Sequence, residues 1–296
     1  MKIKFWIILL SFFFWVQTAS SASVNKNDGA LIISKISTAE LQDLFARYNF
    51  DEFDRMKLKV PRIYLKTLPS DWKDFPEGNI KNRLFIKILL PLVLKVNEQI
   101  SKERADLEKI SDKLSAHEEL SEKEKKFVEE KAVKYDVFTP AKDESRIPVL
   151  LLGLMENVDV LPPSIIIAAA GIYSDWGTSR LALEGNSLFR EELWYTDEGL
   201  APNGNKDSEY RYKTFKDLEE CLTSYMLKMN SHVNYKSIRY ARKVARKMNK
   251  RLYGQQIVAQ MLFDSNLQNI SGLINYTFSY YKLHKTDYYP ELENIR

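Results

Sequence analysis

The feature that most constrains the fold is a long apolar stretch in the middle of the chain, residues 147–177, with the sequence IPVLLLGLMENVDVLPPSIIIAAAGIYSDWG. Pro162, Pro163 and Ser164 are typical of a helix start, because proline is tolerated in the first helical turn. The helix predicted from there to about Asp175 has almost no polar face, so we expect it to be buried on all sides. The rest of the chain must then supply a shell of other elements around it.

Helical patterns also dominate the sequence before this stretch. Residues 37–49 begin with two hydroxyl residues and carry apolar residues on one face, which predicts a helix. A second helix is predicted over about residues 81–113, and Pro91 predicts a kink or a break within it. Ser121 and Glu124 have the spacing of a capping box at the start of a third helix. Residues 98–134 are rich in Glu and Lys and indicate a solvated helical hairpin.

The sequence after the apolar stretch continues this pattern. Residues 186–212 contain many turn-forming residues and are expected to be loop-like. An amphipathic helix follows, with Phe215, Leu218, Leu222 and Met229 in step. The fold class predicted from these patterns is mainly α.

The first 22 residues have the pattern of a secretory signal peptide. Lys2 and Lys4 precede the apolar run of residues 5–16, and Ser20 and Ala22 lie at the −3 and −1 positions of a cleavage site. The run is too short for a stop-transfer helix, and an uncleaved N-terminal anchor is the alternative interpretation. We therefore expect a periplasmic or secreted protein with no transmembrane span in the mature chain.

Composition excludes several classes of function. The net charge is +4, and removal of Lys2 and Lys4 with the signal peptide lowers it to +2, which gives no electrostatic case for nucleic acid binding. The basic cluster of residues 239–251 is interpreted as a solvated helix face. Cys221 is the only cysteine, so no internal disulfide can form. The three histidines have no metal-ligand spacing, so neither a metal nor a cofactor is predicted.

Three segments of the chain, in order, resemble the periplasmic Bax-like branch of bacterial glucosaminidase domains. The central segment, LPPSIIIAAAGIYSDWGTSRLALEGNSLF (161–189), is similar to the signature of that family. The segments VPRIYLKTLP with NRLFIKILLPLVLKVNEQISKERADL (60–107) and TFKDLEECLTSYMLKMNSHVNYKSIR (214–239) resemble the regions before and after it. The resemblance implies a lysozyme-like, mainly helical fold and hydrolysis of the bond from N-acetylglucosamine to N-acetylmuramic acid in peptidoglycan.

The resemblance suggests a division of the chain into four parts. After the signal peptide of residues 1–22, residues 23–145 form an N-terminal helical extension. Residues 146–250 form the glucosaminidase-like domain, and residues 251–296 form a C-terminal helical segment. The interaction partner implied is the glycan strand of peptidoglycan, with a periplasmic protein as a second candidate.

The general acid that the family pattern implies is absent from this chain. The family places a glutamate directly before Ser-x-Trp-Gly, and that position is Tyr173 here. A phenol with a pKa near 10 is too weak an acid for the leaving oxygen of a glycoside. Asp175, Glu191 and Glu198 are weak candidates to replace the glutamate; Asp175 could serve only if the helix ends before it. No second carboxylate is identified.

The loop that follows also departs from the family pattern. The branch has Asn-Leu-Phe-Gly and then two cysteines that would staple the loop. Here Ser187 replaces the asparagine, Arg190 replaces the glycine, and Leu193 and Glu198 fall about where the cysteines would be. Such changes near the site, on a scaffold that is still recognisable, are expected when packing was kept and catalysis was not.

Several side chains are candidates for binding a sugar, because aromatic faces contact pyranose rings and hydroxyls or amides fix their orientation. Each has a structural alternative: Trp176 as a core residue, the hydroxyls as partners of helix-end backbone groups, and Asn186 as a helix C-cap. Tyr225 and Tyr235 are interpreted as core residues. The candidates are Ser174, Trp176, Ser179, Asn186, Phe189, Tyr210 and Tyr212.

The function predicted from the sequence is a catalytically impaired relative that binds cell-wall glycan or a partner protein. Two alternatives stay open. One is an active endo-β-N-acetylglucosaminidase that uses a carboxylate on the 190–200 loop. The other is a scaffold whose cleft is closed by its own side chains, since Tyr173 is bulkier than a glutamate.

Overall fold

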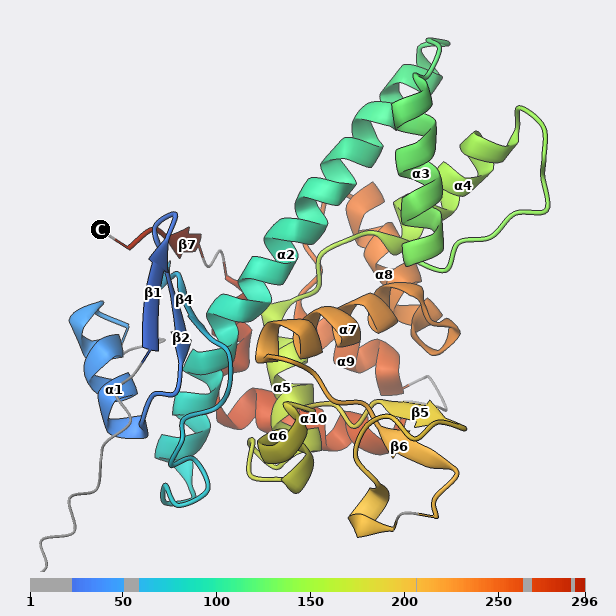
Figure 1. Ribbon diagram of the computed structural model, residues 1–296. Helices are drawn as coiled ribbons and strands as arrows, with labels where there is room; N and C mark the ends of the chain where they lie inside the picture. Colours follow the sequence, from blue (N-terminus) through green and yellow to red (C-terminus); the bar gives the residue numbers. More distant parts are fainter. Residues whose placement is uncertain (1–22, 51–58, 206, 263–267, 289–290, 296) are drawn as a thin grey trace, which may run out of the picture.

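Helices make up most of the protein, which confirms the mainly α prediction (Figure 1). The computed structural model describes residues 23–50, 59–205, 207–262, 268–288 and 291–295, and the predicted signal peptide lies outside them. Figure 1 shows the long helix α2 (Asn79–Ser115) crossing the molecule, with a small sheet beside its first half and a helical hairpin at its other end.

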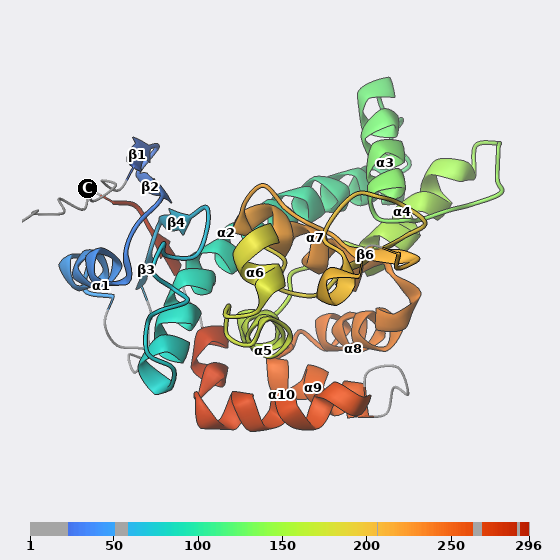
Figure 2. The ribbon, with the colours of Figure 1, turned by 60° about the horizontal axis from the view of Figure 1, so that its bottom comes forward.

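The apolar stretch forms the central helix, α5 (Pro163–Ser174). It packs against α2, α9 (Gly254–Leu262), α10 (Gln268–Tyr280) and the short 3-10 helix η3 (Leu283–Asp287) (Figure 2). All residues from Pro163 to Gly171 are buried, as the missing polar face predicts. The small residues of α5 allow close neighbours: a Cβ on Gly171 would lie 3.1 Å from the Trp176 ring.

A buried carboxylate fixes the start of α5. Asp287 accepts hydrogen bonds from the backbone N–H of Ser164 at 3.0 Å and from the Ser164 hydroxyl at 2.6 Å. It also accepts one from the N–H of Gly254 at 2.9 Å, at the first residue of α9. An anion at two helix N-termini is favourable because the orphan N–H groups and the helix dipole both point at it. Burial nevertheless raises the pKa of Asp287.

Helix α2 continues through Pro91, so of the predicted kink or break the break is wrong, and the kink stays a prediction. Proline removes one helical hydrogen bond and is unfavourable inside a helix. The flanking residues Leu89, Leu90, Leu92 and Val93 are almost fully buried. The burial of this apolar turn offsets the lost hydrogen bond, since each large apolar side chain contributes roughly 2 kcal/mol.

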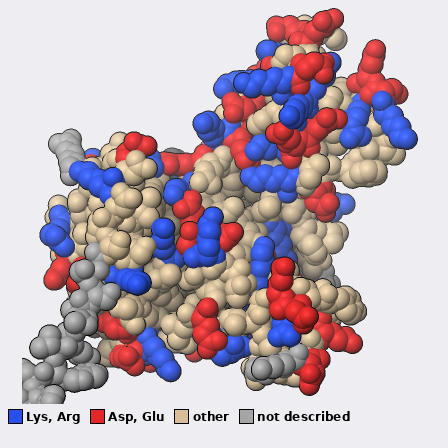
Figure 3. Space-filling model, viewed as in Figure 1, with Lys and Arg blue, Asp and Glu red and all other residues tan. Residues whose placement is uncertain are grey.

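A charged helical hairpin projects from the body of the molecule, as predicted for residues 98–134. It consists of the second half of α2 and α3 (Glu122–Lys134), and α4 (Arg146–Asn157) packs beside α3. Ser121 and Glu124 form the predicted capping box. Figure 3 shows that basic and acidic side chains intermingle on the visible face of this projection. That face therefore carries no strong charge of one sign.

The region before α2 contains a small sheet that the sequence analysis did not predict. Strands β1 (Ser23–Asn27) and β2 (Ala30–Ser34) are antiparallel, and β2 pairs in parallel with β4 (Ile63–Leu65), with Ile32 opposite Tyr64. Helix α1 (Thr38–Arg47) lies beside the sheet and starts at a capping box of Ser37 and Glu40. Near the C-terminus, β7 (Glu291–Glu293) pairs in parallel with β3 (Lys59–Pro61). The two ends of the described chain thus meet.

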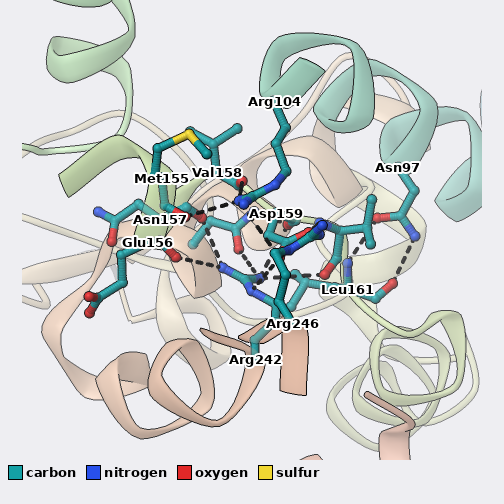
Figure 4. A network of polar contacts seen from close by, with 12 residues as sticks. Asn97, Arg104, Met155, Glu156, Asn157, Val158, Asp159, Leu161, Arg242 and Arg246 are labelled. Atoms are coloured by element: carbon teal, nitrogen blue, oxygen red, sulfur yellow. Dashed lines mark hydrogen bonds and ion pairs between the residues drawn. The ribbon is translucent and has the colours of Figure 1, made fainter. Parts of the chain in front are cut away.

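A buried ionic network holds the connection between α4 and α5 (Figure 4). The carboxylate of Asp159 is 4% exposed and lies 3.8 Å from Arg104 Nη1 of α2 and 3.6 Å from Arg242 Nε. It also pairs with Arg246, and both Arg242 and Arg246 belong to α8 (Lys236–Lys247). Arg242 donates further bonds to the carbonyl oxygens of residues 156, 157 and 159. The network ties three helices to one loop.

Candidate active-site cleft

The end of α5 turns sharply at the residues that resemble the family signature. The helix ends at Ser174, and Asp175, Trp176 and Gly177 follow with φ of 51°, 53° and 83°. The Ser174 hydroxyl donates to the carbonyl of Ala170 at 2.6 Å and accepts from the N–H of Gly177 at 2.9 Å. A Cβ on Gly177 would lie 2.6 Å from Leu68 Cδ1 and 2.8 Å from Trp72 Nε1. Glycine is needed here both for its positive φ and for this close approach.

A small hairpin and a helix lie across from the end of α5. Residues 186–212, expected to be loop-like, contain β5 (Glu192–Trp194), β6 (Tyr210–Tyr212) and the 3-10 turn η1 (Pro202–Gly204). Strands β5 and β6 pair antiparallel, with Leu193 opposite Arg211. Helix α7 (Leu218–Ser231) follows and leads into the short 3-10 helix η2 (Val233–Tyr235). The buried Cys221 of α7 accepts a hydrogen bond from the Leu188 N–H at 3.3 Å, which joins α7 to the start of this segment.

These elements enclose a cleft with a cavity volume of about 780 Å³. Its lining comes from the end of α5, the hairpin, α7 and η2, together with one residue of the loop before α4. The lining residues are Asp136, Tyr173, Phe189, Arg190, Glu191, Glu192, Trp194, Tyr212, Ser224, Tyr225, Leu227, Lys228, Ser231, His232 and Tyr235. A cavity of this size is typical of ligand sites in proteins. The alternative of a scaffold whose cleft is filled by its own side chains therefore does not fit this region.

Tyr173, at the position of the family acid, is one wall of the cleft. Its side chain is half-buried, and burial raises the pKa of its phenol, which the nearby Arg190 guanidinium partly opposes. The Arg190 Nε donates a hydrogen bond to the Tyr173 carbonyl at 2.6 Å. A phenol with a raised pKa stays neutral at physiological pH and is a weaker acid than free tyrosine.

Glu191 is a buried carboxylate in the lining of the same cleft. It is 9% exposed, and its Oε2 accepts a hydrogen bond from the Ser224 hydroxyl at 3.1 Å. The Ser224 oxygen in turn accepts one from Lys213 Nζ at 2.9 Å. Among the described residues, none donates a hydrogen bond to the second carboxylate oxygen, Oε1. Burial raises the pKa of Glu191, and the charges of Lys213 and Lys228 act against that shift.

Aromatic rings form much of the remaining lining. Phe189 stacks on Tyr225 with ring centroids 3.8 Å apart, and Tyr225 meets Tyr235 edge-on at 6.4 Å. Burial raises the pKa of Tyr235 to about 12 and also raises the pKa of Tyr225 well above its ordinary value. Tyr225 and Tyr235 therefore act as neutral hydroxyls on an apolar base. Trp194 is 53% exposed at the edge of the cleft.

The structure brings together only part of the predicted site. Of the carboxylate candidates, Glu191 lines the cleft, whereas Asp175 and Glu198 are exposed and lie outside the lining. Helix α5 does end before Asp175, but its carboxylate faces solvent and accepts from the Thr178 hydroxyl at 3.2 Å. Of the binding candidates, Phe189 and Tyr212 line the cleft, and the remaining ones do not: Ser174, Trp176, Ser179, Asn186 and Tyr210.

The candidates outside the lining have visible structural contacts. The Trp176 ring packs against Tyr281 and Phe85, with ring centroids 4.7 Å and 5.9 Å apart, as expected of a core residue. Ser179 caps the N-terminus of α6 (Arg180–Gly185), and Asn186 is its left-handed C-cap. Tyr210 meets Tyr212 edge-on at 5.5 Å and supports it from behind the lining. A role in binding stays a prediction for these residues.

Sequence reasoning missed several lining residues. Ser224, Lys228 and Tyr225 come from one face of α7, and Tyr235 comes from η2. Helical spacing placed Tyr225 on the apolar face of its helix, which predicted a core residue. Tyr225 is indeed buried, at 6% exposure, but it also lines the cavity. No local signal marked Ser224, whose significance depends on Glu191 33 residues away.

The described residues contain no group of three or more His, Cys, Asp or Glu side chains that could hold a metal ion. In the same part of the chain, no helix combines the length and the apolar character that crossing a bilayer requires. The chemistry that the described cleft offers is that of carboxyl, hydroxyl, amine and aromatic groups.

Comparison with known proteins agrees with this geometry. Residues 151–282 match the sequence model of the Glucosaminidase family, described as mannosyl-glycoprotein endo-beta-N-acetylglucosaminidase. Protein bax of Escherichia coli (strain K12) is 29% identical over 177 residues, which cover 60% of this chain and 61% of that protein. No solved structure matches the chain. Residues 151–282 are therefore similar in sequence to glucosaminidase domains, and the chain is distantly homologous to Protein bax.

Proposed function

We propose that this is an exported protein whose glucosaminidase cleft binds the glycan strands of peptidoglycan without efficient hydrolysis. One observation carries the proposal: Tyr173 stands in the wall of an open cleft at the position where the family pattern has its general acid. Loss of a general acid costs a factor of roughly 10² to 10⁴ in rate. The cleft itself is retained, so we expect glycan binding to persist where hydrolysis is lost.

The lining supports a sugar ligand. Trp194 and Tyr212 of the hairpin offer partly exposed aromatic faces, which suit the apolar faces of pyranose rings. Ser224, Lys228 and Tyr235 add hydroxyl and ammonium groups that can fix the orientation of hydroxyls and amides. Apolar walls with a few polar groups are the usual composition of a small-molecule site.

Binding is tested by pull-down with insoluble peptidoglycan. We expect Tyr212→Ala to lower retention by about tenfold, the factor that corresponds to roughly 1.4 kcal/mol of aromatic contact. Tyr195→Ala is the matched control, because Tyr195 lies in the same hairpin, is 84% exposed and does not line the cleft. Equal retention of both variants and the wild type would show that the cleft does not bind the glycan.

A second candidate function is residual hydrolysis by an endo-β-N-acetylglucosaminidase activity. The observation in its favour is Glu191, a buried carboxyl that faces the cavity with one oxygen unpartnered. An apolar setting keeps a carboxyl protonated at higher pH, as a glycosidase acid requires. Release of reducing ends from peptidoglycan that disappears in Glu191→Gln but persists in Glu192→Gln would establish this function in place of the first.

Export is proposed from the sequence of residues 1–22. Mass spectrometry of the protein recovered from the periplasm or medium should find a chain that begins at Ser23. A recovered chain that still contains the apolar segment of residues 5–16 would instead indicate the N-terminal anchor.

A further inference from the structure

A long segment of the chain has charge of one sign only. From Cys221 to Phe263 there are nine lysine and arginine residues and no aspartate or glutamate. The segment includes α8, and apart from Lys228 none of these nine residues lines the glycan cleft. The charge therefore needs an explanation other than the glucosaminidase site.

Three of the cations are structural. Arg239 is 6% and Arg242 4% exposed, and both donate to backbone carbonyl oxygens. Arg246 pairs with the buried Asp159. These three arginines hold α8 against the body of the protein and are not available to a partner in the same way as the exposed lysines.

The lysines of α8 and the following turn point outward. Lys236, Lys243 and Lys247 recur at helical spacing along one exposed stripe, and Lys250 continues it after the helix ends. Lys243 pairs with Glu156 at 2.6 Å. Within the described residues, Lys236, Lys247 and Lys250 make no ion pair.

Apolar side chains are exposed among these lysines. Tyr240 is 63% and Met248 59% exposed on the same side of α8. Leu152 of α4, 74% exposed, lies across a groove of about 540 Å³ that is also lined by Lys243 and Lys247. We call this set the basic-apolar face: Leu152, Lys236, Tyr240, Lys243, Lys247, Met248 and Lys250.

We propose that the basic-apolar face docks on the surface of an anionic phospholipid bilayer. Lysine ammonium groups bind anionic headgroups, and their long stems allow apolar neighbours to reach the acyl boundary. Tyrosine is favoured at that depth because its ring is apolar and its hydroxyl stays hydrated. None of the residues of the basic-apolar face lines the glycan cleft, so membrane docking leaves the cleft lining unchanged.

The mixture of side chains favours a bilayer over a soluble anion. A phosphate group or a polyanion would use convergent cations and would leave Tyr240, Met248 and Leu152 without a role. Helix α3 shows the contrast within this chain, because its lysines alternate with glutamates and pair with them, as Lys125 does with Glu122 at 2.7 Å. A merely solvated helix such as α3 balances its charge, whereas α8 contains no acidic residue.

The test is co-sedimentation with vesicles of phosphatidylcholine containing one third phosphatidylglycerol, against vesicles of phosphatidylcholine alone. The protein is used without residues 1–22, because their apolar segment would enter vesicles by itself. This shortened chain keeps all the described residues. Each lysine at an anionic surface contributes about fivefold, so we expect Lys236→Gln/Lys247→Gln/Lys250→Gln to lose roughly 100-fold in partitioning. Binding of the wild type should also weaken as salt is added.

The matched control is Lys73→Gln/Lys102→Gln/Lys123→Gln, which removes the same charge from exposed lysines elsewhere and should keep most of the binding. Tyr240→Ser/Met248→Ser should weaken vesicle binding but leave binding to soluble heparin unchanged. Equal loss in both lysine triples would reduce the effect to net charge and overturn the proposal. Unchanged vesicle binding of Tyr240→Ser/Met248→Ser would also overturn the proposal and would indicate that the face binds a soluble polyanion. Circular dichroism melts confirm that every variant is folded.

Discussion

Glu191 provides the sharpest test of the cleft, because its environment predicts both a function and a stability cost. Burial raises its pKa above the ordinary value of 4.5. A raised pKa in the folded state means that the carboxyl favours folding below its unfolded pKa. That contribution is lost as pH rises through the folded pKa. At neutral pH the ionised carboxylate is therefore expected to destabilise the fold relative to a neutral amide.

The magnitude follows from the contacts of the carboxylate. A buried polar group without a partner costs roughly 1–3 kcal/mol, and Oε1 is such a group. The hydrogen bond from Ser224 and the charges of Lys213 and Lys228 offset part of that cost. We expect Glu191→Gln to raise the free energy of unfolding at pH 7 by about 1 kcal/mol, or the Tm by about 2–4 °C. Glutamine has nearly the same volume, so no cavity forms.

The assay is a series of thermal melts from pH 4 to pH 8 for the wild type, Glu191→Gln and Glu192→Gln. Glu192 is the adjacent, exposed carboxylate of the same strand and should show no gain. The gain in Glu191→Gln should be largest at pH 7–8 and shrink towards pH 4, where the wild-type carboxyl is protonated. A variant that is equally or less stable at pH 7, or a gain that does not depend on pH, would refute the account of a desolvated carboxylate.

Substitutions at three further positions test buried charge, close packing and backbone conformation. Asp159→Asn leaves Arg104 and Arg242 without their buried counter-charge and should lower the free energy of unfolding by about 3–5 kcal/mol in urea titrations, whereas the exposed Asp207→Asn should not. Gly177→Ala places a methyl group 2.6 Å from Leu68 and should cost about 3 kcal/mol, visible as a lowered Tm and altered tryptophan fluorescence from Trp72; an unchanged Tm would contradict the packing. Arg190 has a φ of 52°, so Arg190→Gly should be more stable than Arg190→Ala by about 1 kcal/mol in the same titrations, and the reverse order would exclude backbone strain.

The helical framework was predictable because its signals are local. The helix start at Ser37, the capping box at Ser121 and the proline start at Pro163 each depend on residues within one turn, and all three are confirmed. That α2 continues without a break at Pro91 was not predictable locally, because the tolerance of this proline depends on tertiary burial of the surrounding turn. The strands were missed since each has only three to five residues, and β3, β4 and β7 pair with segments far away in the sequence.

The cleft was predictable only in outline. The resemblance placed Tyr173 and the loop near each other, and the structure puts Tyr173, Phe189 and Tyr212 on one cavity. The chemical environment of Glu191 was not predictable, because it depends on Ser224 and Lys213, which meet it only in the folded chain. Sequence alone also does not show that the Trp176 ring lies against Phe85 and Tyr281, as the structural alternative for this residue expected.

The structure also connects two departures from the family pattern that look independent in the sequence. Arg190, where the family has glycine, donates to the carbonyl of Tyr173, where the family has its acid. Its guanidinium lowers the pKa of the Tyr173 phenol against the effect of burial, and it would act in the same direction on a carboxyl at that position.

Restoring the acid alone should therefore give little activity. In Tyr173→Glu, the Arg190 cation stabilises the carboxylate and leaves less of the protonated acid at neutral pH. In Tyr173→Glu/Arg190→Gly, burial acts unopposed by that cation, so we expect about tenfold more release of reducing ends from peptidoglycan and a pH optimum shifted upward. Arg190→Gly alone is the control and should stay at the wild-type level. Equal activity in the single and double variants would show that Arg190 does not control the charge at residue 173. Two inactive variants that fold and still bind peptidoglycan would place the remaining defect elsewhere in the cleft, beyond these two residues.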